Sequence, residues 1–257
     1  TTAAPEPAAS PEAVAFPEAG GNVTVFAAAS LTDAFTTIGE SITAQNPNVT
    51  FTFNFAGSQA LVTQLTEGNP ADVFASANNT QMKAAQEAGL IDGDSVVFTQ
   101  NRLALIVPKD NPAGIASFAD LSKDGVKLVV AAADVPVGNY GRQAICKAAA
   151  DTATYGDGFV EAVQTNIVSE EDNVKAVASK VALGEADAGI VYTTDVTEDI
   201  KADVVVIEIP AEVNIVAKYP IAPVAGGNAD LAAAFIAFVN GPEGQAILQK
   251  YGFEPKP

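Results

Sequence analysis

The chain has 257 residues, of which 48% are hydrophobic and 17% are charged, a composition that supports a packed core in one large domain or two ordinary ones. The absence of histidine and the single cysteine remove the usual general base, the commonest metal ligand and any intrachain disulfide. We expect that cysteine, Cys146, to be a small buried residue of a helix. The net charge of −18 opposes binding to nucleic acid. No stretch reaches the roughly 18 consecutive apolar residues of a membrane-spanning helix.

Residues 1–21 are rich in proline, alanine and glutamate and show no periodicity. Such a segment cannot bury a core, so we expect an extended, flexible linker. It shows neither the positive region nor the apolar region of a secretory signal, so a signal segment is absent from this sequence. Two interpretations stay open: a tether left after removal of a targeting or lipid-anchoring segment, and an end of the chain without a role.

From residue 22 onward, short apolar runs alternate with segments of helical periodicity. In 49–55, Val49 and three phenylalanines alternate with polar residues, as in a half-exposed strand. In chain order the pattern predicts a strand at 22–28, a helix over 31–42, a strand at 49–55, a helix over 61–68, a strand at 72–75, a helix through Met82 to Gly89, strands at 103–108 and 127–133, helices over 138–150 and 174–184, strands at 187–192, 204–209 and 214–224, and helices over 229–240 and 243–250. This alternation predicts an α/β fold of parallel sheets with helices on both faces, and its length suits two lobes.

Two strand-to-helix junctions carry a serine at the turn, Ser30 in VFAAASLTDAF and Ser58 in NFAGSQALVTQL. Taken alone, each serine is interpreted most simply as a helix cap that accepts a backbone N–H. The same helix ends also present unpaired N–H groups and the positive pole of the helix dipole. Two such ends that meet at one edge of a sheet form an anion site without charged side chains. Because no basic residue precedes Lys83, an anion held by this part of the chain depends on such neutral donors.

Two later junctions have the same form. DVPVGNYGRQAI leads through a Pro-Val-Gly turn into a helix and offers the backbone N–H of Val137. A further helix begins near Val174 and leads to a strand that closes on Tyr192. Tyr192 is either a buried aromatic residue whose hydroxyl bonds to the backbone or a donor to the same ligand.

Six motifs, in order along the chain, together resemble the molybdate-binding proteins of ABC transporters: VFAAASLTDAF, FAGSQALVTQL, NPADVFASA, VPVGNYGRQA, GEADAGIVYTTD and GPEGQAILQKYGF. The resemblance covers nearly everything after residue 22. It implies a two-lobed periplasmic-binding-protein (Venus flytrap) fold in which the chain crosses twice between lobes. We expect one lobe from 22–102 plus about 200–257, and the other from about 103–199.

The resemblance also implies a ligand site in the cleft. Ser30 and Ser58 would bind an oxyanion through hydroxyl and backbone N–H groups, and the N–H groups of Val137 and Val174 with the Tyr192 hydroxyl would bind it from the other lobe. The family often has alanine at the position of Val137, and the Asp-Asn pair before Val174 also varies. Neither a catalytic residue, a cofactor nor a direct protein ligand to the metal is implied.

The implied function is extracytoplasmic capture of molybdate or tungstate by a monomer, either periplasmic or tethered as a lipoprotein, for delivery to an ABC permease. A donor-only site suits these dianions, whereas hydrogen phosphate carries a proton that would leave a donor unmatched, at a cost of about 1–3 kcal/mol. Two alternatives stay open: a binding protein for sulfate, phosphate or another oxyanion, and a hydrolase that uses Ser30 or Ser58. The hydrolase lacks a histidine base and a G-x-S-x-G elbow.

An acidic run, Glu170, Glu171 and Asp172, lies just before the Val174 helix. We expect these side chains to point away from the cleft, because unpaired like charges facing a desolvated dianion are costly. A side chain that pointed inward would indicate a cation site or a direct ligand to the metal centre. The nearby Arg142 and Lys175 are expected to be solvated on helix surfaces.

Overall fold

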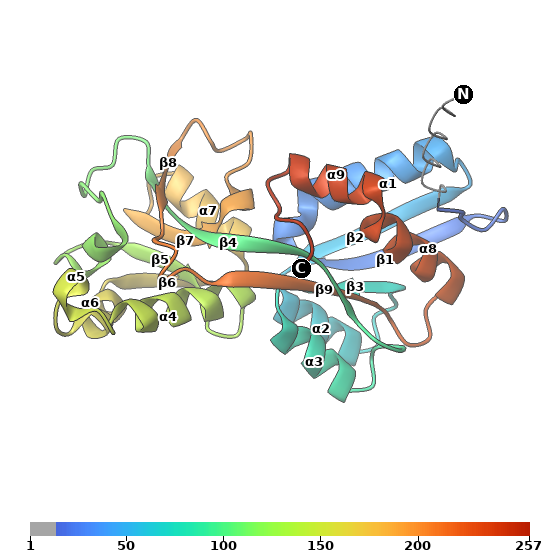
Figure 1. Cartoon of the computed structure of the whole chain (residues 1–257), viewed down its shortest axis with the longest axis horizontal. Coiled ribbons are helices and arrows are strands. Elements are labelled where there is room, and N and C mark those ends of the chain that lie inside the picture. Colours follow the sequence, from blue (N-terminus) through green and yellow to red (C-terminus); the bar gives the residue numbers. More distant parts are fainter. Residues whose placement is uncertain (1–13) are drawn as a thin grey trace, which may run out of the picture.

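The computed structural model describes residues 14–257, which form two lobes joined by two long strands (Figure 1). The first lobe holds β1 (Gly21–Ala28), η1 (Ala29–Leu31), α1 (Thr32–Gln45), β2 (Val49–Ala56), α2 (Ser58–Thr66), β3 (Val73–Ala75), α3 (Asn79–Glu87), α8 (Ala229–Asn240) and α9 (Pro242–Lys250). The second lobe holds η2 (Phe118–Ser122), β5 (Leu128–Ala131), α4 (Pro136–Ala148), α5 (Thr152–Tyr155), α6 (Phe159–Thr165), β6 (Ile167–Glu171), α7 (Val174–Ala182), β7 (Ala188–Tyr192), η3 (Thr193–Asp195) and β8 (Val204–Glu208). The joining strands are β4 (Val96–Pro108) and β9 (Val216–Pro223).

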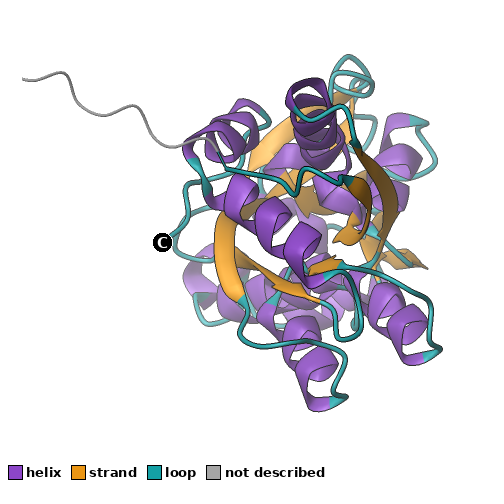
Figure 2. Cartoon of the chain, turned by 90° about the vertical axis from the view of Figure 1, so that its right-hand side faces the viewer, coloured by secondary structure: helices purple, strands orange, loops and turns teal. Residues whose placement is uncertain are grey.

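The sheet of the first lobe has the order β2-β1-β3-β9-β4. β1 pairs in parallel with β2 and β3, whereas β9 runs antiparallel to both of its neighbours, so the sheet is mixed rather than all parallel as predicted. α1, α8 and α9 lie on one face and α2 and α3 on the other (Figures 1 and 2). The predicted alternation in β2 is confirmed, because Phe51, Phe53 and Phe55 are half-buried against the core while Thr50 and Thr52 are exposed.

In the second lobe, β5 pairs in parallel with β6 and β7, and β7 runs antiparallel to β4. The strand β6 was not predicted, because its end carries the acidic residues Glu170 and Glu171 and reads as a solvated loop. The short helices α5 and α6 were also not predicted. Val174, Val177, Ala178 and Val181 are buried, as the predicted helical stripe of α7 requires.

The strand β4 belongs to both lobes. Its residues 96–102 pair with β9, and its residues 103–108 pair with β7 and β8. β8 thus lies in the sheet of the second lobe. This pairing favours a return crossing at β9 rather than the expected one near residue 200.

Two sequence predictions, on the N-terminal segment and on Cys146, differ at least in part from the structure. Residues 1–13 lie outside the described part of the chain, and so does the linker expected there. The expectation of a linker through residue 21 is wrong for its last part, because Phe16 is buried in the core and Gly21 N–H donates to Asn48 O. Cys146 is exposed rather than buried, because it lies on the outer side of α4.

Among residues 14–257, no single helix is long and apolar enough to cross a membrane. The pair α8 and α9 reaches that length and composition together, but the two helices are bent by 61° at their junction. The apolar side of α8 is buried, with Leu231, Phe235 and Val239 in the core.

Candidate functional site

The strand-to-helix junctions of both lobes meet at one small cavity at the interface between the lobes. It is lined by all the residues predicted to bind the ligand: Ser30, Ser58, Val137, Val174 and Tyr192. The rest of the lining is small and apolar: Ala28, Ala29, Ala56, Gly57, Ala77, Val135 and Pro136. Among residues 14–257, no ionisable side chain other than the Tyr192 phenol lines it.

Neither serine caps its helix, so that simpler interpretation is wrong. Ser30 lies within η1, and its Oγ is 2.9 Å from the hydroxyl of Tyr219. Ser58 is the first residue of α2, and its Oγ accepts the N–H of Ala77 at 3.1 Å. Since the backbone N–H of Ala77 can only donate, the proton of Ser58 is free to point to the cavity.

The backbone donors of the second lobe come from the first turns of α4 and α7. Val137 follows Pro136, the first residue of α4, and Val174 is the first residue of α7. Asn173 caps α7 by accepting the N–H of Ala176 at 3.0 Å, which leaves the N–H of Val174 outside that capping bond. First-turn N–H groups have no partner within their own helix, so both can serve a ligand.

Tyr192 ends β7 and is 1% exposed, and among the described residues its hydroxyl has no hydrogen-bond partner. Burial raises the pKa of Tyr192 well above its usual value, and the neighbouring Tyr219, Tyr140 and Asp195 add to the effect. The phenol therefore keeps its proton and acts as a donor. A buried hydroxyl without a partner is costly unless a ligand or water completes it, and this one lines the cavity.

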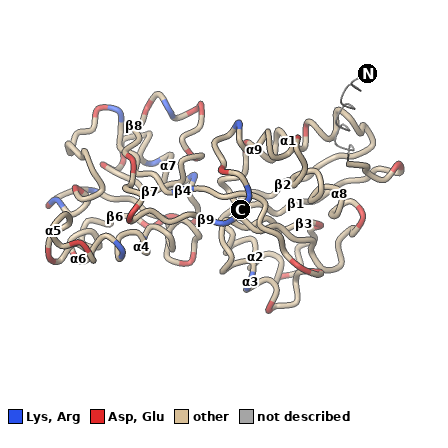
Figure 3. Tube along the Cα trace, in the orientation of Figure 1, with Lys and Arg blue, Asp and Glu red and all other residues tan. Residues whose placement is uncertain are grey.

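The acidic run beside α7 does not line the cavity. Glu170 forms an ion pair with Arg142 at 2.6 Å, and Glu171 forms one with Lys180 at 2.5 Å. Although burial acts in the opposite direction, Lys180 and the Ser169 hydroxyl lower the pKa of Glu171. The Glu171 carboxylate is thus held as an anion, and both glutamates are paired with cations of the second lobe. Acidic and basic segments are distributed over both lobes (Figure 3).

Three polar contacts cross the rim of the cavity. Gln59 Nε2 donates to Asp172 O at 2.9 Å, Gln81 Nε2 donates to Asp134 O at 3.0 Å, and Lys175 forms an ion pair with Asp33 at 3.1 Å. Lys175 and Arg142 remain partly exposed, with 36% and 31% of their side chains accessible, and each also forms an ion pair.

The two lobes are in close contact at this rim. A Cβ atom on Gly57 would lie 2.4 Å from the Asp172 carbonyl oxygen, so only glycine permits this approach. The cleft is closed around the cavity.

Three buried polar residues next to the cavity were not predicted: Asn101, Asp195 and Tyr219. Tyr219 contacts Ser30 across 189 positions of sequence, and its ring packs edge-to-face on Tyr192 with centroids 5.8 Å apart. Asp195 accepts the N–H of Tyr192 through Oδ2 at 3.0 Å. Local sequence carries no signal for such long-range contacts. The motif ending TTD, which includes Asp195, was noted only as part of a resemblance.

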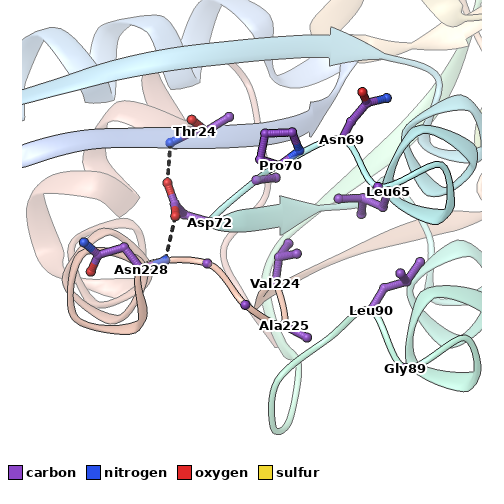
Figure 4. Close-up of a pocket in the computed structure, with 14 residues that line it drawn as sticks. Thr24, Leu65, Asn69, Pro70, Asp72, Gly89, Leu90, Val224, Ala225 and Asn228 are labelled. Atoms are coloured by element: carbon purple, nitrogen blue, oxygen red, sulfur yellow. Dashed lines mark hydrogen bonds between the residues drawn. The ribbon is translucent and has the colours of Figure 1, made fainter.

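A second, larger pocket lies wholly in the first lobe, at the opposite end of β1 and β3 (Figure 4). Its polar centre is Asp72, whose two carboxylate oxygens accept the N–H groups of Thr24 and Asn228, both at 2.7 Å. We call it the Asp72 pocket. Both oxygens of the Asp72 carboxylate are therefore already hydrogen-bonded to the backbone.

The two-lobed fold with a closed interlobe cavity is that of a solute-binding protein. The chain belongs to the bacterial extracellular solute-binding proteins, because the model of that family matches residues 23–254. It is similar to the molybdate-binding protein ModA of Mycobacterium tuberculosis (strain H37Rv), with 40% identity over 249 residues that cover 96% of this chain and 89% of that protein.

Solved structures agree on the fold. The periplasmic molybdate-binding protein of Azotobacter vinelandii has a TM-score of 0.77 at 18% identity and covers 91% of this chain and all of its own. The sulfate-binding protein SubI from Mycobacterium tuberculosis H37Rv has a TM-score of 0.81 at 18% identity, over 91% of this chain and 86% of that one. At this identity, the two likenesses define the fold and leave the ligand to be argued from the site.

Proposed function

We propose that this protein captures molybdate, or the closely similar tungstate, in the interlobe cavity and delivers it to the permease of an ABC transporter. The observation that carries the proposal is the convergence of neutral donors from both lobes on one cavity, to whose lining the described residues contribute no carboxylate. Identity of 40% to a molybdate-binding protein supports the choice of ligand.

The roles of the residues follow from their geometry. Ser30 and Ser58 donate from the first lobe, and the N–H groups of Val137 and Val174 with the Tyr192 hydroxyl donate from the second. All bind the oxygens of the anion, so the metal centre has no protein ligand. Helix N-termini add the positive ends of their dipoles, which stabilise a dianion without a basic side chain.

Closure of the lobes connects binding to transport. The first lobe would comprise β1 to the first half of β4 with β9, α8 and α9, and the second the segment between them. A ligand that contacts both lobes favours the closed arrangement over an open one by its differential affinity. A permease that recognises the closed form then receives loaded protein. We place the monomeric protein outside the cytoplasm, in the periplasm or tethered to a membrane.

The hydrolase alternative finds no support at the two serines. Ser30 Oγ contacts the Tyr219 hydroxyl, and Ser58 Oγ accepts a backbone N–H. Tyr219 is a poor base, because burial raises its pKa well above the usual value and keeps the phenol protonated. The described surroundings of these serines thus lack an activating group, as expected of a binding protein.

A thermal melt with molybdate, tungstate, sulfate and phosphate added separately tests the proposal. A ligand at about 1,000 times its dissociation constant stabilises the native state by about 4 kcal/mol, which raises the melting temperature of a chain this long by roughly 8–16 °C. A large rise with molybdate and tungstate alone is expected. A rise with sulfate or phosphate alone would assign the cavity to a different oxyanion, and no rise with any of them would overturn the proposal.

A further inference from the structure

The hydroxyl of Ser30 has a buried partner behind it. Its Oγ lies 2.9 Å from the hydroxyl oxygen of Tyr219, which is fully buried and does not line the cavity. Either oxygen of that pair can donate. The direction of the bond therefore depends on Asn101, the other hydrogen-bond partner that the Tyr219 hydroxyl has among the described residues.

The orientation of the Asn101 amide is fixed by a group that can only donate. Its Oδ1 accepts the backbone N–H of Arg102 at 2.9 Å and the hydroxyl of Thr193 at 3.0 Å. Its Nδ2 therefore faces the other way, 2.8 Å from Thr194 Oγ1 and 3.4 Å from the Tyr219 hydroxyl. An amide nitrogen only donates, so Tyr219 accepts from Asn101.

The proton of Tyr219 then lies on the side of Ser30. Burial raises the pKa of Tyr219 well above its usual value, so the phenol remains protonated and has a proton to place. It donates to Ser30 Oγ, and the proton of Ser30 is directed to the cavity. The chain of bonds runs in one direction, from Asn101 through Tyr219 and Ser30 to the ligand.

Ser58 is also fixed as a hydrogen-bond donor to the cavity, here by one direct bond from the backbone. Ser58 Oγ accepts the N–H of Ala77 directly, so its proton also points away from that bond. Both serines and the protonated Tyr192 present hydrogen atoms to the same cavity.

We infer that Tyr219 and Asn101 are positioning residues that fix Ser30 as a donor and so set the site's specificity for fully deprotonated tetrahedral oxyanions. The inference rests on the proposed function. A hydrogen phosphate ion brings an O–H that needs an acceptor, and a serine whose lone pair is already engaged by Tyr219 is a poor one.

A double-mutant cycle tests the inference by titration calorimetry with molybdate on the full chain. Wild type, Ser30→Ala, Tyr219→Phe and the double variant are compared. Tyr219→Phe is expected to weaken binding about tenfold in the wild-type background, as for loss of one good hydrogen bond. In the Ser30→Ala background the same substitution is expected to change the dissociation constant by less than about twofold, because its effect passes through the Ser30 hydroxyl.

The control is Tyr251→Phe, which also removes a hydroxyl-to-hydroxyl bond, to Thr37 at 2.7 Å, but outside the cavity. It is expected to leave the dissociation constant unchanged. Equal losses for Tyr219→Phe in both backgrounds would show a packing role and overturn the inference. No heat from wild type with molybdate, tungstate or sulfate would instead overturn the proposed function, and the inference with it.

A competition measurement tests directly the preference for sulfate over hydrogen phosphate. Bound molybdate is displaced by sulfate and by hydrogen phosphate at pH 8, and the ratio of the two half-displacing concentrations is compared between variants. Tyr219→Phe frees Ser30 to accept, so the preference for sulfate is expected to fall about tenfold, the equivalent of one hydrogen bond. An unchanged ratio would overturn the specificity role. If Tyr219→Phe lacks a cooperative melt, Asn101→Asp in the same two backgrounds replaces it, because a carboxylate there would draw the proton of Tyr219 away from Ser30.

Discussion

The interlobe cavity and the Asp72 pocket differ in size and in how their polar groups are satisfied. The Asp72 pocket is the larger of the two, yet both oxygens of its carboxylate accept backbone N–H groups. The Tyr192 hydroxyl, which belongs to the cavity lining, is buried without a partner among the described residues, and so is Oδ1 of the neighbouring Asp195. A buried polar group that the protein itself does not satisfy is what a ligand would complete, so the contrast favours the interlobe cavity over the larger pocket.

Asp195, which is buried beside the cavity, gives the largest expected effect. Burial raises the pKa of Asp195 from 3.8 to about 7, although the N–H of Tyr192 and the charge of Lys175 act in the opposite direction and that of Asp33 adds to the rise. Because the folded state holds this proton more tightly, its contribution to stability is complete below about pH 4 and is lost as the pH rises through 7. The linked change is on the order of 4 kcal/mol.

Urea unfolding of wild type and Asp195→Asn at pH 4.5, 6 and 8 measures this contribution. The free energy of unfolding of wild type, relative to that of the variant, should decrease as the pH rises. An asparagine can still accept the N–H of Tyr192, so the comparison isolates the charge. Parallel pH profiles for the two proteins would contradict the raised pKa and show that Asp195 is not held in its protonated form.

The next effect concerns Tyr192, whose hydroxyl has no hydrogen-bond partner among residues 14–257 that its removal would leave unpaired. Tyr192→Phe is expected to weaken molybdate binding about 10- to 100-fold, as for loss of a hydrogen bond to a charged group, while the melting temperature without ligand stays the same or rises. Calorimetry and a ligand-free melt check both parts.

Ser58→Ala serves as the contrasting variant. It should weaken binding to a similar degree and also lower the melting temperature without ligand, because it leaves the N–H of Ala77 unpaired. If Tyr192→Phe bound molybdate as tightly as wild type, the assignment of this hydroxyl to the ligand would be wrong.

These contrasts also show which parts of the candidate site could be predicted from the sequence. The junctions at Ser30, Ser58, Val137 and Val174 were predictable because a strand that ends at a small residue before a helix is a local pattern. The function assigned to the serines as caps was wrong, because their partners Tyr219 and Ala77 come from other strands or loops. No local pattern contains those partners.

The strand β4, which joins the two lobes, was predicted too short for a related reason. Its first half, 96–102, includes Gln100, Asn101 and Arg102, which interrupt the apolar pattern, so only 103–108 was predicted. In the fold, Asn101 is fully buried and satisfied by Thr193, Thr194 and Tyr219. A buried polar residue with distant partners looks like a loop residue in the sequence.

A substitution in the Asp72 pocket should lower the stability of the protein without changing its affinity for molybdate. Asp72→Asn keeps one acceptor oxygen and loses the other, so the free energy of unfolding is expected to fall by about 1.5 kcal/mol, the value of one charge-assisted bond. The dissociation constant for molybdate should not change. Urea unfolding and calorimetry on the same preparation separate the two quantities. A weaker affinity with unchanged stability would mean that the larger pocket takes part in binding.

The smallest expected effect is at the rim of the cavity. The bond from Gln81 to the Asp134 carbonyl exists only while the lobes are in contact, so it adds to the closed state and not to either lobe alone. Gln81→Ala should weaken molybdate binding about two- to tenfold, as for one partly exposed hydrogen bond, and leave the ligand-free melting temperature unchanged.

Gln86→Ala, on the exposed side of the same helix α3, is the matched control and should bind as wild type does. Calorimetry on the two variants decides between two arrangements of the lobes. If Gln81→Ala alone weakens molybdate binding, the closed arrangement of the lobes seen at the rim is the one that holds the ligand. Equal affinities for both variants would mean that the ligand-bound protein closes without this bridge, and the rim contacts would then belong to a different closure from the one that loads the site.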